Sequence, residues 1–137
     1  MSLGIGQGTA LRTWTVKDEM HTPGDILTGT GVSPGTASGP ARTVHNIDEF
    51  SDVKPGEVLV CRTTDPAWTP LFAVASAIIT ETGGMLSHAA IVAREYGIPA
   101  VLGVTDALNR ITPGTMLVVD GTYGTVRENP ASTGTAS

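Results

Sequence analysis

The sequence is poor in cysteine, in basic residues and in long apolar runs, and each shortage excludes a class of protein. The single cysteine, Cys61, permits neither an internal disulfide nor a cysteine-rich metal site, so we expect no metal site. Lys and Arg total 8 against 13 Asp and Glu, and the resulting net charge of −5 argues against a nucleic-acid-binding surface. No apolar run approaches the roughly 20 residues that span a membrane. The opening segment MSLGIGQGTA lacks the features of a signal peptide, so we expect a cytoplasmic protein with no nucleic-acid or membrane partner.

Glycine and proline, by contrast, are abundant. The 17 Gly and 9 Pro make up 26 of 137 residues, which is about 19% against a usual 12% or so. This composition indicates many turns and short elements and is not typical of a helix bundle. The length suits one domain of roughly 100–150 residues. Such a domain seldom contains both a nucleotide-binding lobe and a separate substrate barrel. If the chain transfers a chemical group, we expect it to be one component of a larger machine.

The order of apolar segments and breakers predicts a mixed α/β domain that is richer in strands than in helices. We interpret residues 1–24 as a tail or linker, 25–128 as the domain and 129–137 as a flexible tail. Strands are predicted over residues 25–32, 36–44, 57–62, 75–80, 99–102, 116–120 and 124–127. Because Gly39-Pro40 interrupts the second of these strands, that strand is expected to bend or to lie at a sheet edge.

One main helix is predicted, from about Ser87 to Tyr96, after a Gly-Gly loop. Gly97 ends it in the usual way, with a proline just beyond. A short helix capped by Asp65 and a helical turn over residues 106–110 are also expected. On the main helix, one stripe of side chains is assigned to the sheet: Ala89, Val92, Ala93 and Tyr96.

The candidate chemical site is the start of the main helix. Gly83-Gly84 permit positive φ and close approach of the backbone to a ligand. Ser87 is a favourable N-cap, so His88 is expected at the first helical position, where unpaired N–H groups and a partial positive charge bind anions. A histidine in this position suits phosphoryl transfer. Before a phosphoryl group is transferred to the ring, the positive helix end favours the neutral, nucleophilic imidazole; after transfer, it favours the added phosphate charge. His88 is therefore the candidate phosphoryl-carrying residue.

Other polar residues leave alternatives open. Thr64, Glu81 and Thr82 are candidates for supporting contacts around His88. Glu81 either orients the imidazole or is simply solvated, and neither interpretation is favoured. Thr64 belongs to a polar loop near the same sheet edge, where Asp65 is more simply interpreted as a helix cap.

The remaining histidines and a nearby arginine receive structural interpretations. His21 and His45 have no supporting context. Arg94 lies about 120° round the helix and about 9 Å along it from His88. It is therefore expected to complement the helix C-terminus and not to clamp a phosphate.

The segment from Thr82 to Gly103 resembles the signature of the phosphohistidine swivelling (mobile) domain of phosphoenolpyruvate-utilising enzymes. These include phosphoenolpyruvate synthase, pyruvate phosphate dikinase, enzyme I of the sugar phosphotransferase system and rifampin phosphotransferase. The matching residues are Gly83-Gly84, Ser87-His88, Ala93-Arg94, Gly97-Ile98-Pro99-Ala100-Val101 and Gly103. Residues 32–35, 39–42 and 64–72 agree as well, and the last of these stretches looks most like the synthase-like and rifampin phosphotransferase branch. The resemblance covers about residues 25–127.

The resemblance implies a β/β/α fold in which His88 aligns with the phosphorylated histidine and Gly83, Gly84 and Ser87 with the loop and helix start around it. It implies a phosphoryl carrier that moves between an ATP-grasp-type nucleotide site and a phosphoenolpyruvate/pyruvate or other acceptor site. Those sites would lie on partner domains, in cis or in trans, which would bind ATP, phosphoenolpyruvate and Mg, whereas this domain itself would bind no cofactor. The chain would be a phosphotransferase component and not a complete enzyme. Phosphoenolpyruvate synthase has a regulatory threonine where this chain has Leu86, so that form of control is not expected.

Two alternatives remain open from the sequence. The first is the carrier, and the second is a non-catalytic docking or structural module that retains the fold. The intact Gly-Gly-x-x-Ser-His run favours the carrier, because a scaffold need not keep a nucleophile. The final acceptor, whether pyruvate, water, phosphate, an antibiotic or a protein histidine, is left undetermined.

Overall fold

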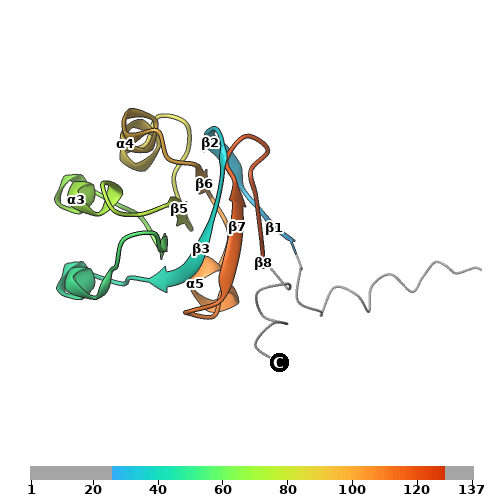
Figure 1. Ribbon diagram of the computed structural model, residues 1–137. Coiled ribbons are helices and arrows are strands. Elements are labelled where there is room, and N and C mark those ends of the chain that lie inside the picture. The colour runs from blue at the N-terminus through green and yellow to red at the C-terminus, as the bar shows by residue number, and fades with distance from the viewer. Residues whose placement is uncertain (1–25, 129–137) are drawn as a thin grey trace, which may run out of the picture.

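The computed structural model describes residues 26–128 (Figure 1). The expectations for residues 1–24 and 129–137 lie outside this range. The strands are β1 (Ile26–Thr28), β2 (Thr30–Ser33), β3 (Thr36–Thr43), β4 (Val58–Cys61), β5 (Ala77–Thr80), β6 (Ala100–Leu102), β7 (Met116–Asp120) and β8 (Thr125–Glu128). The helices are α3 (Thr69–Phe72), α4 (His88–Tyr96) and α5 (Ala107–Arg110), with two 3₁₀ segments, η1 (Ile47–Asp52) and η2 (Pro66–Trp68).

Every strand predicted from the sequence is present, and the structure differs from the predicted elements in two details. The segment expected as one strand over residues 25–32 forms β1 and β2, which are separated at Gly29. At Gly29 the chain passes so near Leu102 that a Cβ atom would overlap the Leu102 carbonyl oxygen. The other difference is η1, which the sequence analysis did not predict. Its cap is local, because the Asn46 side chain accepts a hydrogen bond from the Asp48 N–H.

The strands form two sheets that share β3. In the first sheet, β1, β8, β7 and the first half of β3 are antiparallel neighbours. In the second, β3, β4, β5 and β6 are parallel and β2 is antiparallel to β6. β3 therefore lies between β7 and β4 in the continuous strand order, with Thr36–Pro40 paired to β7 and Ala41–Thr43 paired to β4. Each half of β3 is the last strand of its own sheet, and Pro40, which cannot donate a ladder hydrogen bond, lies where β3 passes from one sheet to the other.

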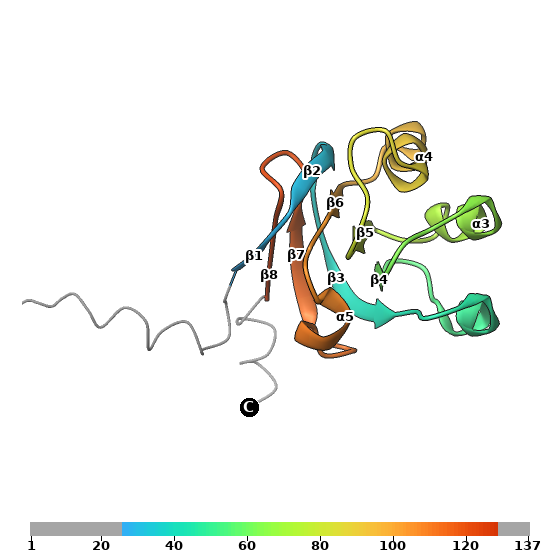
Figure 2. The same ribbon diagram turned by 180° about the vertical axis from the view of Figure 1, so that it is seen from behind.

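The elements stack in three layers, as Figures 1 and 2 show. Helices α3 and α4 and the segment η1 cover one face of the second sheet, and the first sheet covers the other. One apolar cluster lies between helices and sheet, and a second lies between the two sheets. β4 divides its side chains between them by the two-residue period of a strand: Leu59 and Cys61 join the first cluster, and Val58 and Val60 join the second. The β/β/α architecture expected from the resemblance is thus confirmed.

Cys61 is fully buried in the apolar cluster between the helices and the second sheet. Burial, with a smaller contribution from Glu81, raises the pKa of its thiol to about 12, so the thiolate is strongly disfavoured at neutral pH. Over residues 26–128, no helix has the length and apolar character needed to cross a membrane.

Candidate functional site

The main helix α4 begins at His88, as predicted, and local contacts explain why. Ser87 has extended backbone angles, and its hydroxyl accepts a hydrogen bond from the Ala90 N–H at 3.4 Å. The same hydroxyl donates to the Gly84 carbonyl at 2.8 Å. Gly97 adopts the left-handed conformation and ends the helix. His88 therefore stands at the first helical position, and its side chain is partly exposed.

Two threonine hydroxyls contact the imidazole of His88. Thr64 Oγ1 lies 2.9 Å from Nδ1, and Thr69 Oγ1 lies 3.4 Å from Nε2. The Phe72 ring meets the imidazole edge to face, with centroids 6.0 Å apart and an interplanar angle of 87°. Thr64 is nearly buried and Thr69 is partly exposed. The ring is thus held firmly at Nδ1, while Nε2 has the longer contact.

The two glycines before the helix have different conformations. Gly83 has a φ of 115°, a region that L side chains rarely adopt, and a Cβ atom there would lie 3.2 Å from Ser87 Oγ. Gly84 has no positive φ, and nothing lies within 4 Å of the place where its Cβ would be. Of these two glycines, only Gly83 has a backbone conformation that requires glycine. At Gly84 a side chain would meet open space.

The three supporting residues proposed from the sequence make different contacts in the structure. Thr64 contacts His88 directly. Thr82 lies at the start of the glycine loop, where its hydroxyl donates to the Arg62 carbonyl at 3.2 Å. Glu81 accepts a hydrogen bond from the Leu108 N–H at 2.9 Å. Its carboxylate therefore supports the start of α5 and is neither simply solvated nor used to orient the imidazole.

Thr69 contacts the His88 ring without having been predicted from the sequence as a site residue. This threonine follows η2, and the helical turn brings it back beside the ring that Thr64 contacts. The Asp65 cap, whose side chain accepts from the Ala67 N–H, was the available signal, because it starts the turn that separates the two threonines. The distance between this turn and His88 depends on packing between α3 and α4, which the sequence pattern does not reveal.

The predicted role of Arg94 is wrong. Its side chain runs toward the start of α4, where Nε donates to the Val32 carbonyl at 2.8 Å and Nη2 donates to the Met85 carbonyl at 2.6 Å. Because long side chains on a helix point toward its N-terminus, the partners of Arg94 lie toward the start of α4 and not at its C-terminus.

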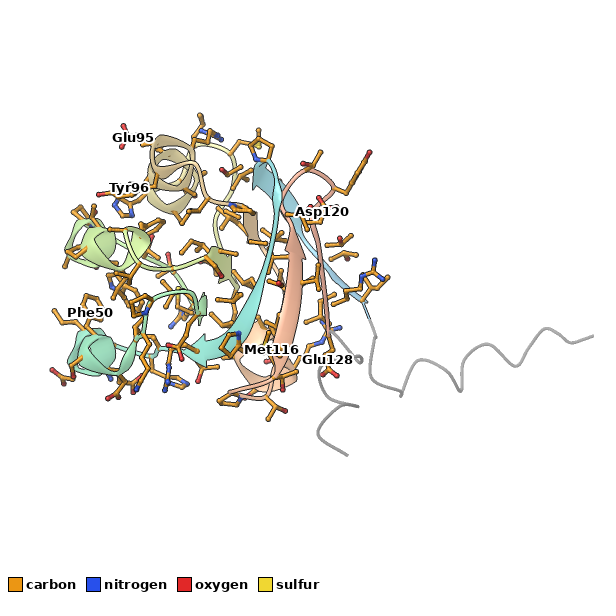
Figure 3. The ribbon with its side chains drawn as sticks, viewed as in Figure 1. Phe50, Glu95, Tyr96, Met116, Asp120 and Glu128 are labelled. Atoms are coloured by element: carbon orange, nitrogen blue, oxygen red, sulfur yellow. The ribbon has the colours of Figure 1, made fainter. Side chains whose placement is uncertain are left out.

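The predicted buried stripe of α4 needs one change. Ala89, Val92 and Ala93 are buried as expected, but Tyr96 is 45% exposed and Ala90 is buried in its place. Figure 3 shows Tyr96 at the α3 side of α4, and its ring centroid lies 6.4 Å from that of Phe72. Because α4 packs on α3 as well as on the sheet, its buried face is wider than one stripe and is turned toward Ala90.

The structure leaves the other histidines away from this site or beyond the described residues. His45 is exposed, and its ring lies 3.6 Å from the Glu49 carboxylate beside η1. His21 lies outside residues 26–128. Within those residues, no cluster of three or more His, Cys, Asp or Glu side chains is arranged to hold a metal ion.

A three-layer β/β/α domain that presents a histidine at a helix start, after a glycine loop, defines a class of mobile domains in enzymes that use phosphoenolpyruvate. Residues 53–124, more than half of the chain, match the family model described as "PEP-utilising enzyme, mobile domain". The chain belongs to this family, as the resemblance indicated.

Three curated relatives are similar to this chain over part of their length. It is 51% identical over 111 residues to the uncharacterized phosphotransferase YvkC of Bacillus subtilis, covering 81% of this chain and 13% of that protein. It is 45% identical over 112 residues to a phosphoenolpyruvate synthase of Aeropyrum pernix, covering 80% of this chain and 14% of the synthase. It is also 45% identical over 102 residues to a rifampicin phosphotransferase of Streptomyces sviceus, covering 74% of this chain and 12% of that enzyme. The predicted similarity to the synthase-like and rifampin phosphotransferase branch is thus confirmed.

A solved structure supports the fold. The solution structure of an Enzyme I protein (nEIt) superimposes with a TM-score of 0.51 at 33% identity, covering 58% of this chain and 33% of that chain. The chain spans only 12–14% of the length of the three curated relatives above.

Proposed function

We propose that this chain is a phosphoryl-carrier domain in which His88 accepts a phosphoryl group from one partner site and donates it to another. The observation that carries the proposal is the geometry of the His88 ring. A nearly buried threonine holds Nδ1 at 2.9 Å, while the ring stays partly exposed at the start of α4. A carrier needs a nucleophile that is fixed in orientation and accessible to partners, and this arrangement meets both needs.

The contacts favour Nε2 as the attacking atom. A neutral imidazole carries its proton on one nitrogen and a lone pair on the other. If Nδ1–H donates to Thr64 Oγ1, the lone pair lies on Nε2, where the 3.4 Å contact to Thr69 is easily displaced. The Nε2 lone pair then forms the N–P bond as the phosphorus–oxygen bond of the donor breaks and the leaving oxygen takes the electron pair. Nδ1 keeps its proton, and the resulting positive charge on the ring is offset by the added phosphoryl group.

Partner domains would supply the rest of the chemistry. Phosphoryl transfer requires cations or metal ions around the transferring group. Arg94, the arginine of α4, is instead bonded to two backbone carbonyls. We therefore assign ATP, phosphoenolpyruvate and Mg to an ATP-grasp-type lobe and a phosphoenolpyruvate/pyruvate or other acceptor lobe. That the chain matches only 14% of the Aeropyrum pernix synthase supports the presence of such lobes beside it.

The identity of the final acceptor follows from the partner lobe and not from this domain. The names of the relatives include a phosphoenolpyruvate synthase and a rifampicin phosphotransferase. Both match this chain at 45% identity, so the same carrier domain is compatible with different acceptors.

A chimeric enzyme tests the proposal. This chain replaces the matching 112-residue segment of the Aeropyrum pernix phosphoenolpyruvate synthase, and the chimera is incubated with radiolabelled phosphoenolpyruvate. We expect one label on His88 that is lost in acid and stable in base, as phosphoramidates are. His88→Ala abolishes the label, while His21→Ala and His45→Ala, as matched controls, retain it. Label that persists in His88→Ala, or that survives acid on Ser87, would contradict the carrier and favour the docking module.

A further inference from the structure

Arg94 joins two backbone segments that are distant in the sequence. One is Val32 in β2, and the other is Met85 in the loop between β5 and α4. The two hydrogen bonds are short, at 2.8 and 2.6 Å, and leave from neighbouring nitrogens of one planar guanidinium. The side chain is thus a rigid fork between the edge strand of the second sheet and the loop that precedes His88.

The loop from Gly83 to Leu86 has little else to hold it. Its two glycines are the most flexible residues available to a chain. Met85 and Leu86 are 53% and 87% exposed, so their side chains contribute little packing. At its far end, the Ser87 N–H and hydroxyl both donate to the Gly84 carbonyl. The position of the Ser87 cap therefore depends on the loop, and the loop depends on the hydrogen bond from Arg94 to Met85.

The contribution of Arg94 is geometric and not electrostatic. Both of its partners are neutral carbonyl oxygens. Arg94 is an exposed residue, so solvent and salt screen its charge from groups beyond its direct contacts. A lysine at this position would keep the charge but could not span the two carbonyls with a planar fork.

We propose that Arg94 is a positioning residue for His88: it ties the glycine loop to β2 and so fixes the Ser87 cap and the imidazole above it. The consequence for phosphoryl transfer rests on the proposed carrier function. The effect on the loop and on the ring does not, and it is measured separately.

The loop is tested by amide hydrogen exchange on the full chain. In Arg94→Met we expect protection of the Ser87 amide to fall about tenfold or more, because hydrogen bonds from a charged donor are lost, while the β4 amides stay protected. Arg94→Lys should lose protection to a similar extent. Arg110→Met is the matched control, because Arg110 also lies in the last turn of a helix and donates to a backbone carbonyl, that of Thr105 at 3.1 Å, yet belongs to α5.

The imidazole is tested by two further measurements on the same variants. The ring-nitrogen NMR signals of His88 should shift in Arg94→Met toward those of a ring without the Thr64 contact. Labelling with phosphoramidate, which transfers its phosphoryl group to a ring nitrogen and releases ammonia, should slow at His88 relative to His45. The exposed His45 is an internal reference in every sample.

Three results would overturn the inference: unchanged exchange at Ser87, loss of protection spread evenly over the domain, or full recovery in Arg94→Lys, which would show that charge suffices. If the wild-type chimera carries no label on His88 but exchange at Ser87 changes as expected, the carrier function fails and the positioning of the loop stands.

Discussion

At the scale of single residues, two neighbours fix the position and the ring orientation of His88. Ser87 sets where the helix begins, and Thr64 sets how the ring is turned, through a hydrogen bond across 24 residues of sequence. These two constraints come from different directions, one along the backbone and one through the ring. Together they restrict the orientation of the imidazole, while the side chain stays partly exposed.

Replacing Thr64 by valine tests the hold on Nδ1. Valine has nearly the same shape but lacks the hydroxyl, so we expect Thr64→Val to slow labelling of His88 by about tenfold, with a change in stability of about 1 kcal/mol. Labelling rates and urea unfolding measure the two effects. Thr69→Val is the matched control, and because its contact to Nε2 is the longer one, it should have the smaller effect on the rate. Equal effects of the two substitutions would contradict the assignment of Nε2 as the attacking atom.

At the scale of elements, two glycines allow backbone segments to approach closely where β2 passes the turn between β7 and β8. A Cβ atom on Gly31 would overlap the Gly121 carbonyl oxygen, and one on Gly121 would overlap the Ser33 carbonyl oxygen. Both contacts are with backbone, which cannot move aside as a side chain can. The glycines here permit the consecutive strands β1 and β2 to belong to different sheets, β1 to the first and β2 to the second.

Alanine substitutions compare the close approach of β2 to the β7–β8 turn with the glycine loop before α4. Gly121→Ala should destabilise the domain by about 3 kcal/mol or more, because the overlap is with main chain. Gly84→Ala should change stability by less than about 1 kcal/mol, since the new methyl group meets nothing within 4 Å. Thermal unfolding of the two variants measures the difference. If Gly121→Ala proves as stable as Gly84→Ala, the backbones at Gly121 and Ser33 can separate at little cost and the prediction is wrong.

An ion pair connects β3 to the segment before β4. The Arg42 guanidinium donates to both carboxylate oxygens of Glu57, at 3.0 and 2.9 Å, and the Lys54 N–H donates to Glu57 at 2.7 Å. The hydrogen bond from Arg42 holds the pKa of the Glu57 carboxyl below its ordinary value, although burial partly opposes the shift. Folding therefore favours the ionised carboxylate.

Stability should depend on pH accordingly. Because the pKa of Glu57 is lower in the folded state than in the unfolded chain, its contribution is fully present above the unfolded value of about 4.3 and is lost as pH falls through the folded value. Urea unfolding from pH 7 to pH 3 should show wild type more stable than Glu57→Gln at pH 7, with the gap narrowing below about pH 5. A gap that stays constant over this range would rule out the contribution.

At the scale of the whole molecule, the domain presents His88 from a rigid three-layer body. Helices α3 and α4 both pack on the second sheet, so the two threonines and the histidine belong to one unit. A carrier that serves separate sites is expected to move as such a unit, because deforming the layers would break the geometry around the ring.

The isolated chain should neither hydrolyse ATP nor consume phosphoenolpyruvate at a useful rate. The expected reason is that phosphoryl transfer needs cations or metal ions around the transferring group, whereas residues 26–128 contain no cluster of three or more His, Cys, Asp or Glu side chains arranged to hold a metal ion. Phosphate and pyruvate release assays on the chain alone, with the chimera as the positive control, measure this. Turnover by the isolated chain, retained in His88→Ala, would point to a separate active centre.

Local sequence by itself determined the start and end of α4, the cap at Asp65 and the strand pattern. Each depends on contacts within a few residues, as between Ser87 and Ala90, or on the two-residue period of a strand. The same local signals, with the family resemblance, were enough to single out His88. They also placed Thr64 near the correct edge of the sheet.

Tertiary structure alone decided which side chains reach the ring and its loop. The contacts of Thr69 and Arg94, and the placement of Glu81 at α5, join residues from 9 to 62 positions apart. Such pairs meet only after the helices have packed on the sheet, and no local pattern encodes the distance between them. The same reason explains β3, whose Gly39-Pro40 indicated a bend, while the choice between an edge and a strand shared by two sheets depended on the partners at its two ends.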